Sequence, residues 1–242
     1  MNPSTLPIET PDIETSSEDY ARRFSGTVGD YFLRKQIEIL FELVKPWPGA
    51  RVLDVGGGHA QTAPPLVKAG FGVTVAGSTL ECRRRLDQLL DPDTYEFRIG
   101  NLFSLPFEEK SFDLVLAFRL LPHLDHWPLL IAELCRLARK AVVVDYPDLR
   151  SVNLFSKFLF KPKKALEGNT RPFRCFHRRE LLRAFSSHNF GQPLFRPEFF
   201  LPMALHRALN SGPSSTRMES FFLRIKLTPR LGSPVILRVT SR

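Results

Sequence analysis

Asp54 and the three glycines after it form the most informative short segment of the sequence. A short apolar stretch typical of a buried strand contains Asp54, and Gly56, Gly57 and Gly58 follow it directly. Glycines allow a tight turn and a close approach of the backbone to a ligand, and ligands of open α/β sheets bind at the carboxyl ends of the strands. The dinucleotide fingerprint G-x-G-x-x-G/A is incomplete, because its last position holds Gln61. A carboxylate beside this turn favours a cationic amino-acid group over a pyrophosphate.

Three further side chains lie where predicted strands end, and each has a chemical and a structural interpretation. His123 follows the fourth predicted strand, and Asp145 and Tyr146 end the fifth. An imidazole, with an ordinary pKa of about 6.5, suits a general base. Asp145 or Tyr146 would orient an acceptor molecule. The alternatives are a structural loop histidine and hydrogen bonds within the turn after the strand.

The hydrophobic pattern around these residues alternates between short apolar strands and helices. The strands are predicted at residues 51–55, 73–76, 95–99, 112–118 and 141–145, and the helices between them at 61–69, 80–90 and 127–139. This alternation predicts an α/β fold, a Rossmann-like doubly wound sheet that is mostly parallel. N-terminal helices are expected over residues 18–44, and late antiparallel strands at 195–203 and 235–240.

Two segments fall outside this alternation. Residues 1–17 are rich in Pro, Ser and Thr, and are predicted to form a disordered lead before a single domain over residues 18–242. Residues 148–179 combine basic residues with phenylalanines and are predicted to form a lid insertion. Between Ser151 and Phe185 nine Lys and Arg residues oppose two Glu residues, so most of the net charge of +9 lies in this stretch.

Composition limits the class of protein. With 242 residues and 43% hydrophobic residues the chain can bury a core, which excludes wholesale disorder. There is no signal-peptide pattern in the first residues and no long apolar run. The three scattered cysteines predict neither disulfides nor a metal site, so we expect a cytoplasmic protein with reduced thiols. The basic charge attracts anions, but no nucleic-acid-binding motif accompanies it, and no obligate protein partner is inferred.

Several short segments resemble, in their order and spacing, a known enzyme family. They are residues 52–58, 100–102, 105–107, 111–115, 122–124 and 176–181. The first resembles motif I (D/E-x-G-x-G) of class I methyltransferases that use S-adenosylmethionine (SAM). The Leu-Pro-Phe and Ser-Phe-Asp-Leu-Val runs are similar to those of the type 11 subgroup, which includes methyltransferases of ubiquinone and menaquinone biosynthesis. The resemblance extends over about residues 20–200.

The resemblance implies SAM as the cofactor and methyl transfer to a small-molecule or lipid-like acceptor. The cofactor-binding residues that it implies are Asp54, Gly56, Gly57, Gly58, His59, Gly77, Ser78, Asn101, Leu102 and, from an N-terminal helix, Arg23. Two positions depart from the family pattern. The acid that holds the ribose at the end of strand two is replaced by Gly77, and the acid of the strand-three loop by Asn101. Ser78 or Glu81 is the candidate substitute for the ribose contact.

Three other functions remain open. An RNA or protein methyltransferase is compatible with the charge, but the Asn/Asp-Pro-Pro-Tyr/Phe motif is absent after strand four, where residues 117–120 read Ala-Phe-Arg-Leu. A non-catalytic domain that kept the fold would explain Gly77 and Asn101. An NAD-dependent oxidoreductase is disfavoured by Gln61. Within the leading interpretation, the basic lid predicts an apolar, anionic acceptor and peripheral contact with an anionic membrane surface.

Overall fold

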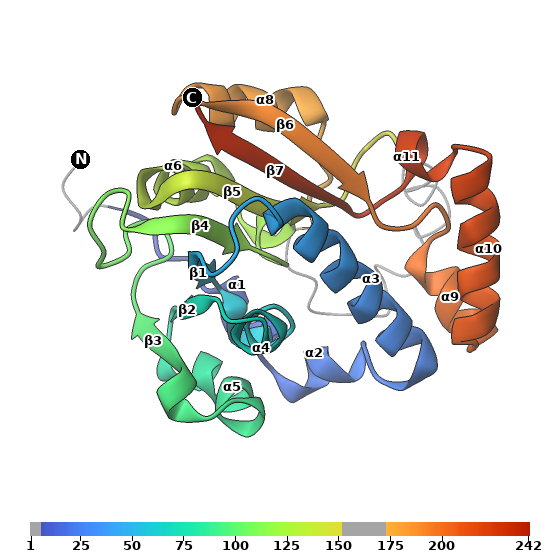
Figure 1. Cartoon of the computed structure of the whole chain (residues 1–242), viewed down its shortest axis with the longest axis horizontal. Coiled ribbons are helices and arrows are strands. Elements are labelled where there is room, and N and C mark those ends of the chain that lie inside the picture. The colour runs from blue at the N-terminus through green and yellow to red at the C-terminus, as the bar shows by residue number, and fades with distance from the viewer. Residues whose placement is uncertain (1–5, 152–172) are drawn as a thin grey trace.

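A twisted seven-stranded sheet runs through the middle of the molecule (Figure 1), in a computed structural model that describes residues 6–151 and 173–242. The strand order is β3-β2-β1-β4-β5-β7-β6. The strands are β1 (Arg51–Val55), β2 (Gly72–Gly77), β3 (Tyr95–Ile99), β4 (Phe112–Ala117), β5 (Ala138–Tyr146), β6 (Phe190–Pro197) and β7 (Val235–Ser241). Strands β1 to β5 are parallel, and β7 is antiparallel to both of its neighbours. The chain order reverses between β1 and β4, where a crevice for ligands is expected in such sheets.

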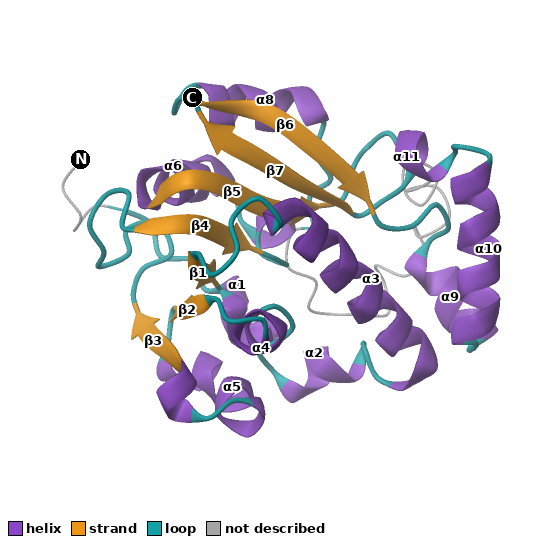
Figure 2. Cartoon of the chain, in the orientation of Figure 1, coloured by secondary structure: helices purple, strands orange, loops and turns teal. Residues whose placement is uncertain are grey.

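Helices cover both faces of the sheet (Figure 2) because alternate strand residues are apolar toward both sides. One core contains Leu53 and Val115 and packs against α6 (Trp127–Leu137) and α8 (Arg178–Ser186). The other contains Val52 and Leu114 and packs against α3 (Gly26–Val44), α4 (Ala63–Lys68) and α5 (Arg84–Leu89). The remaining helices of the described residues are α1 (Pro11–Thr15), α2 (Glu18–Arg22), α9 (Met203–Leu209), α10 (Gly212–Arg224) and α11 (Thr228–Leu231). Short 3-10 turns are η2 (Gly57–His59), η3 (Leu80–Arg83), η4 (Pro92–Thr94) and η5 (Leu121–His123).

The predicted Rossmann-like sheet with a late antiparallel strand is confirmed. The late strand predicted at 195–203 is misplaced, since β6 spans Phe190–Pro197 and Met203 begins α9. Pairing with β7 decides this position, because Phe190 lies opposite Ser241 and Pro197 opposite Val235. Residues 152–172 of the predicted lid lie outside the described residues. The two ends of that segment are joined where Leu149 N–H donates to the Phe176 carbonyl at 3.0 Å.

The predicted disordered lead is wrong for residues 6–17. Residues 11–15 form α1, which Pro11 begins, and the Ser17 hydroxyl caps α2 by accepting from Tyr20 N–H at 3.2 Å. Asp12 and Thr15 are buried. The composition of this segment indicated disorder, but its polar side chains find partners on the sheet edge. No helix among the described residues is long and apolar enough to cross a membrane.

Candidate functional site

The glycine turn after β1 is shaped by the side chains packed around it. Gly56 adopts φ +71°, a conformation that favours glycine, and a Cβ there would lie 2.6 Å from the Leu120 side chain. A Cβ on Gly57 would overlap the Asp54 carboxylate. The turn then continues as η2 rather than as a regular helix. The backbone therefore folds tightly over Asp54.

Asp54 is fully buried below this turn, and half of its carboxylate lacks a partner. Oδ2 accepts a short hydrogen bond from the Thr62 hydroxyl, whereas Oδ1 has no hydrogen-bond partner. Burial raises the pKa of Asp54 to about 7, and the Thr62 hydrogen bond opposes that rise only in part. A buried carboxylate oxygen without a partner is costly. A cationic group next to Asp54 would supply the missing interaction and favour the ionised form.

His59 is also buried, and its ring is neutral. Its Nδ1 accepts from Gln61 N–H at 3.1 Å, which leaves the ring proton on Nε2. Burial, together with the positive charges of Arg119 and Arg85, lowers the pKa of His59 to about 3. The predicted contact with a cofactor carboxylate would therefore use a neutral N–H donor and no ion pair.

The end of β2 has no space for an acid of its own. A Cβ on Gly77 would lie 2.9 Å from the side chains of both Cys82 and Phe97, so any larger residue would displace them. An acid nevertheless reaches this place from α1. Ser78 donates to Asp12 through its backbone N–H at 2.6 Å and through its hydroxyl at 2.7 Å. Asp12 was not predicted as a site residue, because the predicted disorder of residues 1–17 excluded it from the site.

The loop after β3 also contacts the N-terminal segment. The Asn101 side chain accepts from Phe103 N–H at 3.0 Å, and its Nδ2 donates to the Pro7 carbonyl at 3.0 Å. Leu102 is fully buried in one of the two cores. Asn101 therefore does face the predicted cofactor side, and its partner in this structure is a backbone carbonyl of the chain itself.

Arg119 was not predicted as a site residue, yet it organises the next strand ends. It follows β4 with φ +64°, donates from its backbone N–H to Asp145 at 2.6 Å, and donates from Nη2 to Gln36 at 2.6 Å. Its guanidinium lies 4.5 Å from the centre of the Phe24 ring. Burial disfavours the charged form, but Tyr20 and Asp145 hold the pKa of Arg119 above its ordinary value. The available sequence signal was a single arginine within an apolar run, directly after the fourth predicted strand.

The three predicted catalytic residues are not equally placed for that role. Burial raises the pKa of Asp145, but the carboxylate is committed to Arg119. Tyr146 is fully buried and packs with its ring centre 6.3 Å from that of Phe176. His123 is half-buried at the end of η5, with its ring centre 5.8 Å from that of Phe173. Of the three, His123 is the one with solvent access.

Arg23, predicted to reach the cofactor, lies on the protein surface. Its Nη2 is 3.8 Å from Glu14 Oε1, and its guanidinium lies 5.1 Å from the centre of the Tyr20 ring. Together with Arg22 and Arg207 it lines a hollow of about 520 Å³ at the start of α3. Asp54, the glycine turn, Ser78 and Asn101 thus share the carboxyl edge of the sheet, while Arg23 belongs to a separate basic hollow.

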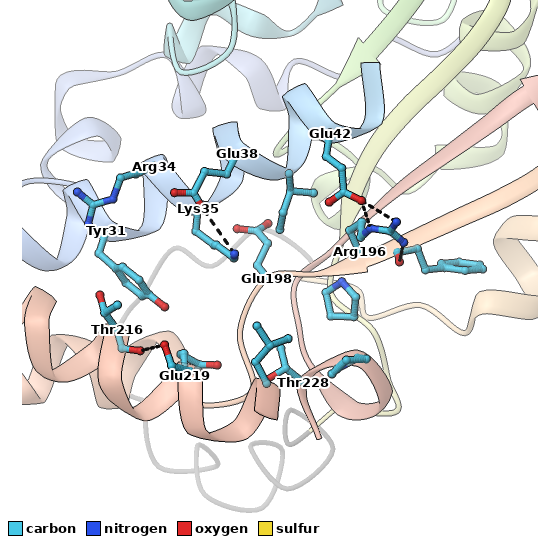
Figure 3. Close-up of a pocket in the computed structure, with 16 residues that line it drawn as sticks. Tyr31, Arg34, Lys35, Glu38, Glu42, Arg196, Glu198, Thr216, Glu219 and Thr228 are labelled. Carbon is cyan, nitrogen blue, oxygen red and sulfur yellow. Dashed lines mark hydrogen bonds and ion pairs between the residues drawn. The ribbon is translucent and has the colours of Figure 1, made fainter. Parts of the chain in front are cut away.

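A second cavity of about 520 Å³ lies between α3, the end of β6 and α10 (Figure 3). Its charged side chains are mostly paired, as in the contact of Arg196 Nη2 with Glu42 Oε1 at 2.7 Å. Glu198 differs from these pairs, because its Oε1 is buried without a hydrogen-bond partner, and burial raises its pKa to about 8. None of the predicted cofactor or catalytic residues lines this cavity.

A known protein family matches the part of the chain that contains the glycine turn. Residues 53–144 match the type 11 methyltransferase domain family. Residues 53–144 therefore form a methyltransferase domain of this family. The predicted resemblance is thereby confirmed, and the matched region includes Asp54, the glycines, Ser78, Asn101 and His123.

Individual relatives of the methyltransferase domain are distant. The phthiotriol/phenolphthiotriol dimycocerosates methyltransferase of Mycobacterium leprae is 34% identical over 112 residues, which are 43% of this chain and 40% of that protein. Less than half of that relative is therefore matched. Among solved structures, the magnesium protoporphyrin IX methyltransferase of Synechocystis with bound SAH has a TM-score of 0.61 and 16% identity, covering 89% of this chain and 86% of the other. Geranyl diphosphate methyltransferase in complex with SAM has a TM-score of 0.58 and 21% identity, covering 86% and 84%.

Proposed function

We propose that the domain binds SAM at the carboxyl ends of β1, β2 and β3 and transfers its methyl group to a small-molecule or lipid-like acceptor. The observation that carries this proposal is the buried Asp54 carboxylate, whose Oδ1 has no partner below a glycine turn. These residues fit a ligand with a cationic amino-acid end. The family of residues 53–144 and the two neighbours solved with SAH and SAM support the choice of cofactor.

The chemistry asks the protein for binding and orientation more than for acid or base strength. Bound SAM would supply a methyl group on a sulfonium, which is already electrophilic. Asp54 would hold the cationic end, and the glycine turn would let the backbone approach it closely. The Arg119–Asp145 pair would form a rigid wall beside this place, because its charges already satisfy one another. Where the acceptor must lose a proton, His123 is the candidate base, since it is half-buried and Asp145 is committed.

An anionic group on the acceptor is supported by the basic hollow at the start of α3. Arg22, Arg23 and Arg207 line it, and burial together with the charge of Arg23 lowers the pKa of Arg207. An anion placed there would relieve repulsion between guanidinium groups. The geranyl diphosphate methyltransferase neighbour and the Mycobacterium relative support an acceptor with a large apolar part. The predicted contact of residues 152–172 with an anionic membrane falls on residues outside the described part.

Calorimetric titration with SAM and with its demethylated product SAH tests the cofactor assignment. We expect wild-type protein to bind both and Asp54→Ala to weaken binding by about 1.5–3 kcal/mol, the scale of a hydrogen bond to a charged group. Asp113→Ala is a matched control, because Asp113 is a buried acid near the opposite ends of the strands, paired with Lys140 at 2.9 Å. Equal SAM affinity in the wild type and Asp54→Ala would contradict the site.

Methyl transfer itself needs a separate measurement. SAH formation should appear when the protein and SAM are incubated with amphiphilic alcohols or phenols that carry phosphate or carboxylate groups. SAM binding without SAH formation on any such acceptor would favour a non-catalytic domain. SAH formation with RNA or protein alone would favour the other methyltransferase class.

A further inference from the structure

Residues 6–16 cross the carboxyl edge of the sheet, and we name this segment the N-terminal strap. At one end the Pro7 carbonyl accepts from Asn101 Nδ2 in the loop after β3. Next along the strap, the Glu9 carboxylate accepts from the backbone N–H groups of Asp125 and His126 at 2.9 and 3.0 Å. The strap is therefore held by its own polar groups along most of its length.

Asp12 is the centre of this attachment. Its two carboxylate oxygens accept from the backbone N–H and hydroxyl of Ser78, and Oδ2 lies 3.3 Å from the Cys82 thiol sulfur. The residue is fully buried. Asp12 thus occupies the end of β2, where the predicted site needs free polar groups for a ligand.

The far end of the strap lies against the glycine turn. A Cβ on Gly58 would overlap the Ser16 hydroxyl and the Cys82 carbonyl, so Ser16 lies directly against the side of the Gly58 backbone from which a side chain would project. Ser16 itself is buried. The strap therefore extends from the β3 loop past the β2 end to the β1 turn, across the three places where the cofactor-binding residues of the proposed site gather.

We propose that the N-terminal strap is a built-in competitor of SAM, which must leave the sheet edge before the cofactor binds. This inference rests on the proposed function, because it assumes that SAM uses the β1–β3 edge. The strap and the cofactor need the same groups, namely the Ser78 N–H, the Asn101 side chain and the open side of Gly58. A ligand that binds only the strap-open protein has its apparent affinity reduced by the open fraction.

The strap is suited to reversible release. Its helix α1 has five residues, and so short a helix is not stable on its own. Ile8 is 76% exposed, so the strap buries little apolar surface there. The attachment depends mainly on hydrogen bonds to carboxylates, which water can replace once the segment moves away. Release would therefore not require the sheet or either of its cores to unfold.

The opposite interpretation is that the strap closes over bound SAM and that Asp12 supplies the acid missing from β2. The contacts of Asp12 favour the competitor, since both of its oxygens are already occupied and the side chain is closed to solvent. The two interpretations predict changes of opposite sign, both in strap mobility and in cofactor affinity.

Hydrogen–deuterium exchange of the full chain with and without saturating SAH distinguishes them. We expect faster exchange in residues 8–16 when SAH is bound, because the strap is displaced. The Cys82 thiol, now buried beside Asp12, should react faster with a thiol reagent under the same conditions. Slower exchange in residues 8–16 with SAH bound would overturn the proposal and show that the strap is a cover.

Cofactor affinity supplies the second test. Asp12→Ala should bind SAH about tenfold more tightly than wild type, because the strap loses the contacts with Ser78. Glu14→Ala is the matched control, since Glu14 carries the same charge on the same helix but extends toward Arg23. Weaker binding by Asp12→Ala would overturn the proposal that the strap competes with SAM and would leave the proposed function intact. Absence of SAH binding in the wild type, in Asp12→Ala and in a chain lacking residues 2–16 would overturn both.

Discussion

Two buried aspartates at the carboxyl ends of β1 and β5, which flank β4, differ in what surrounds them. Asp145, at the end of β5, receives the backbone N–H of Arg119 and lies 3.8 Å from its guanidinium. Asp54, at the end of β1, has Thr62 as its hydrogen-bond partner and no cation bonded to it among the described residues. A buried acid with its own cation contributes to the structure, whereas one without a cation is destabilising until a ligand arrives. Asp145 thus has a structural role, whereas Asp54 is the acid of the proposed binding site.

Replacing the paired acid, Asp145, should have the largest effect on stability. Asp145→Ala should lower the free energy of unfolding by about 3–5 kcal/mol, because it leaves the Arg119 guanidinium buried without its acid. Urea denaturation followed by circular dichroism measures this. The double variant Asp145→Leu, Arg119→Leu should recover much of the loss. Full stability of Asp145→Ala alone would remove the distinction between the two acids.

Replacing the unpaired acid, Asp54, should raise the stability of the protein. Asp54→Asn should raise the stability of the ligand-free protein at pH 8 by about 1–3 kcal/mol, on the basis of about 1.4 kcal/mol for each pKa unit. The folded-state pKa of about 7 lies above that of the unfolded chain. The stabilising contribution of the protonated form is therefore complete below about pH 4 and is lost as the pH rises through about 7.

Wild-type stability should accordingly fall over that pH range, and the fall should be reduced in Asp54→Asn. Affinity for SAM should rise over the same range, because a cationic group binds the ionised carboxylate. If wild type and Asp54→Asn had parallel pH profiles in denaturation and in calorimetry, the pKa of Asp54 would lie outside this pH range.

Glu198 offers a smaller test of the same principle outside the proposed cofactor site. Its pKa of about 8 is also raised by burial, so Glu198→Gln should reduce the loss of stability between about pH 5 and pH 8. Because Glu198 lines the separate cavity of Figure 3, SAM affinity should stay within about twofold of wild type. A large loss of affinity would place that cavity in the cofactor site.

The smallest expected signal is that of NAD. A titration with NAD should give no measurable binding, because its pyrophosphate would meet the Asp54 carboxylate and the glycine fingerprint is incomplete at Gln61. Binding in the micromolar range would show that Asp54 is not the acid of an amino-acid site.

The contrast between the two acids also shows what the sequence could predict. Asp54 stands next to three glycines, and a local motif of this kind is visible without knowledge of the fold. Strands β1, β2, β4 and β5 were predictable for a similar reason, since each is a short and mostly apolar run, and β3 was predictable from its alternation of apolar and charged residues. Arg119 and Gln36 are 83 positions apart in the chain, and no local pattern announces their hydrogen bond. Asp12 was missed because its partner Ser78 lies 66 positions away.

The C-terminal part was harder to predict, because its elements are defined by their neighbours. The bounds of β6 follow from its register with β7, and β7 is the last strand in the sequence. Helices α9, α10 and α11 were not predicted, and α10 is much less apolar overall than α6. Tertiary packing determines the secondary structure of such segments, and local sequence patterns do not predict that packing.

The position of β7 between β5 and β6 has a consequence for how the protein is made. On the ribosome, residues 51–146 can emerge and pair before β7 exists, but β6 has no strand to join until residues 235–241 follow it. Throughout that interval the hydrogen-bonding edge of β5 is open to any other extended chain. A newly made molecule is therefore exposed to such pairing until β7 has been synthesised, and slowing translation between the codons for β6 and β7 would prolong that exposure.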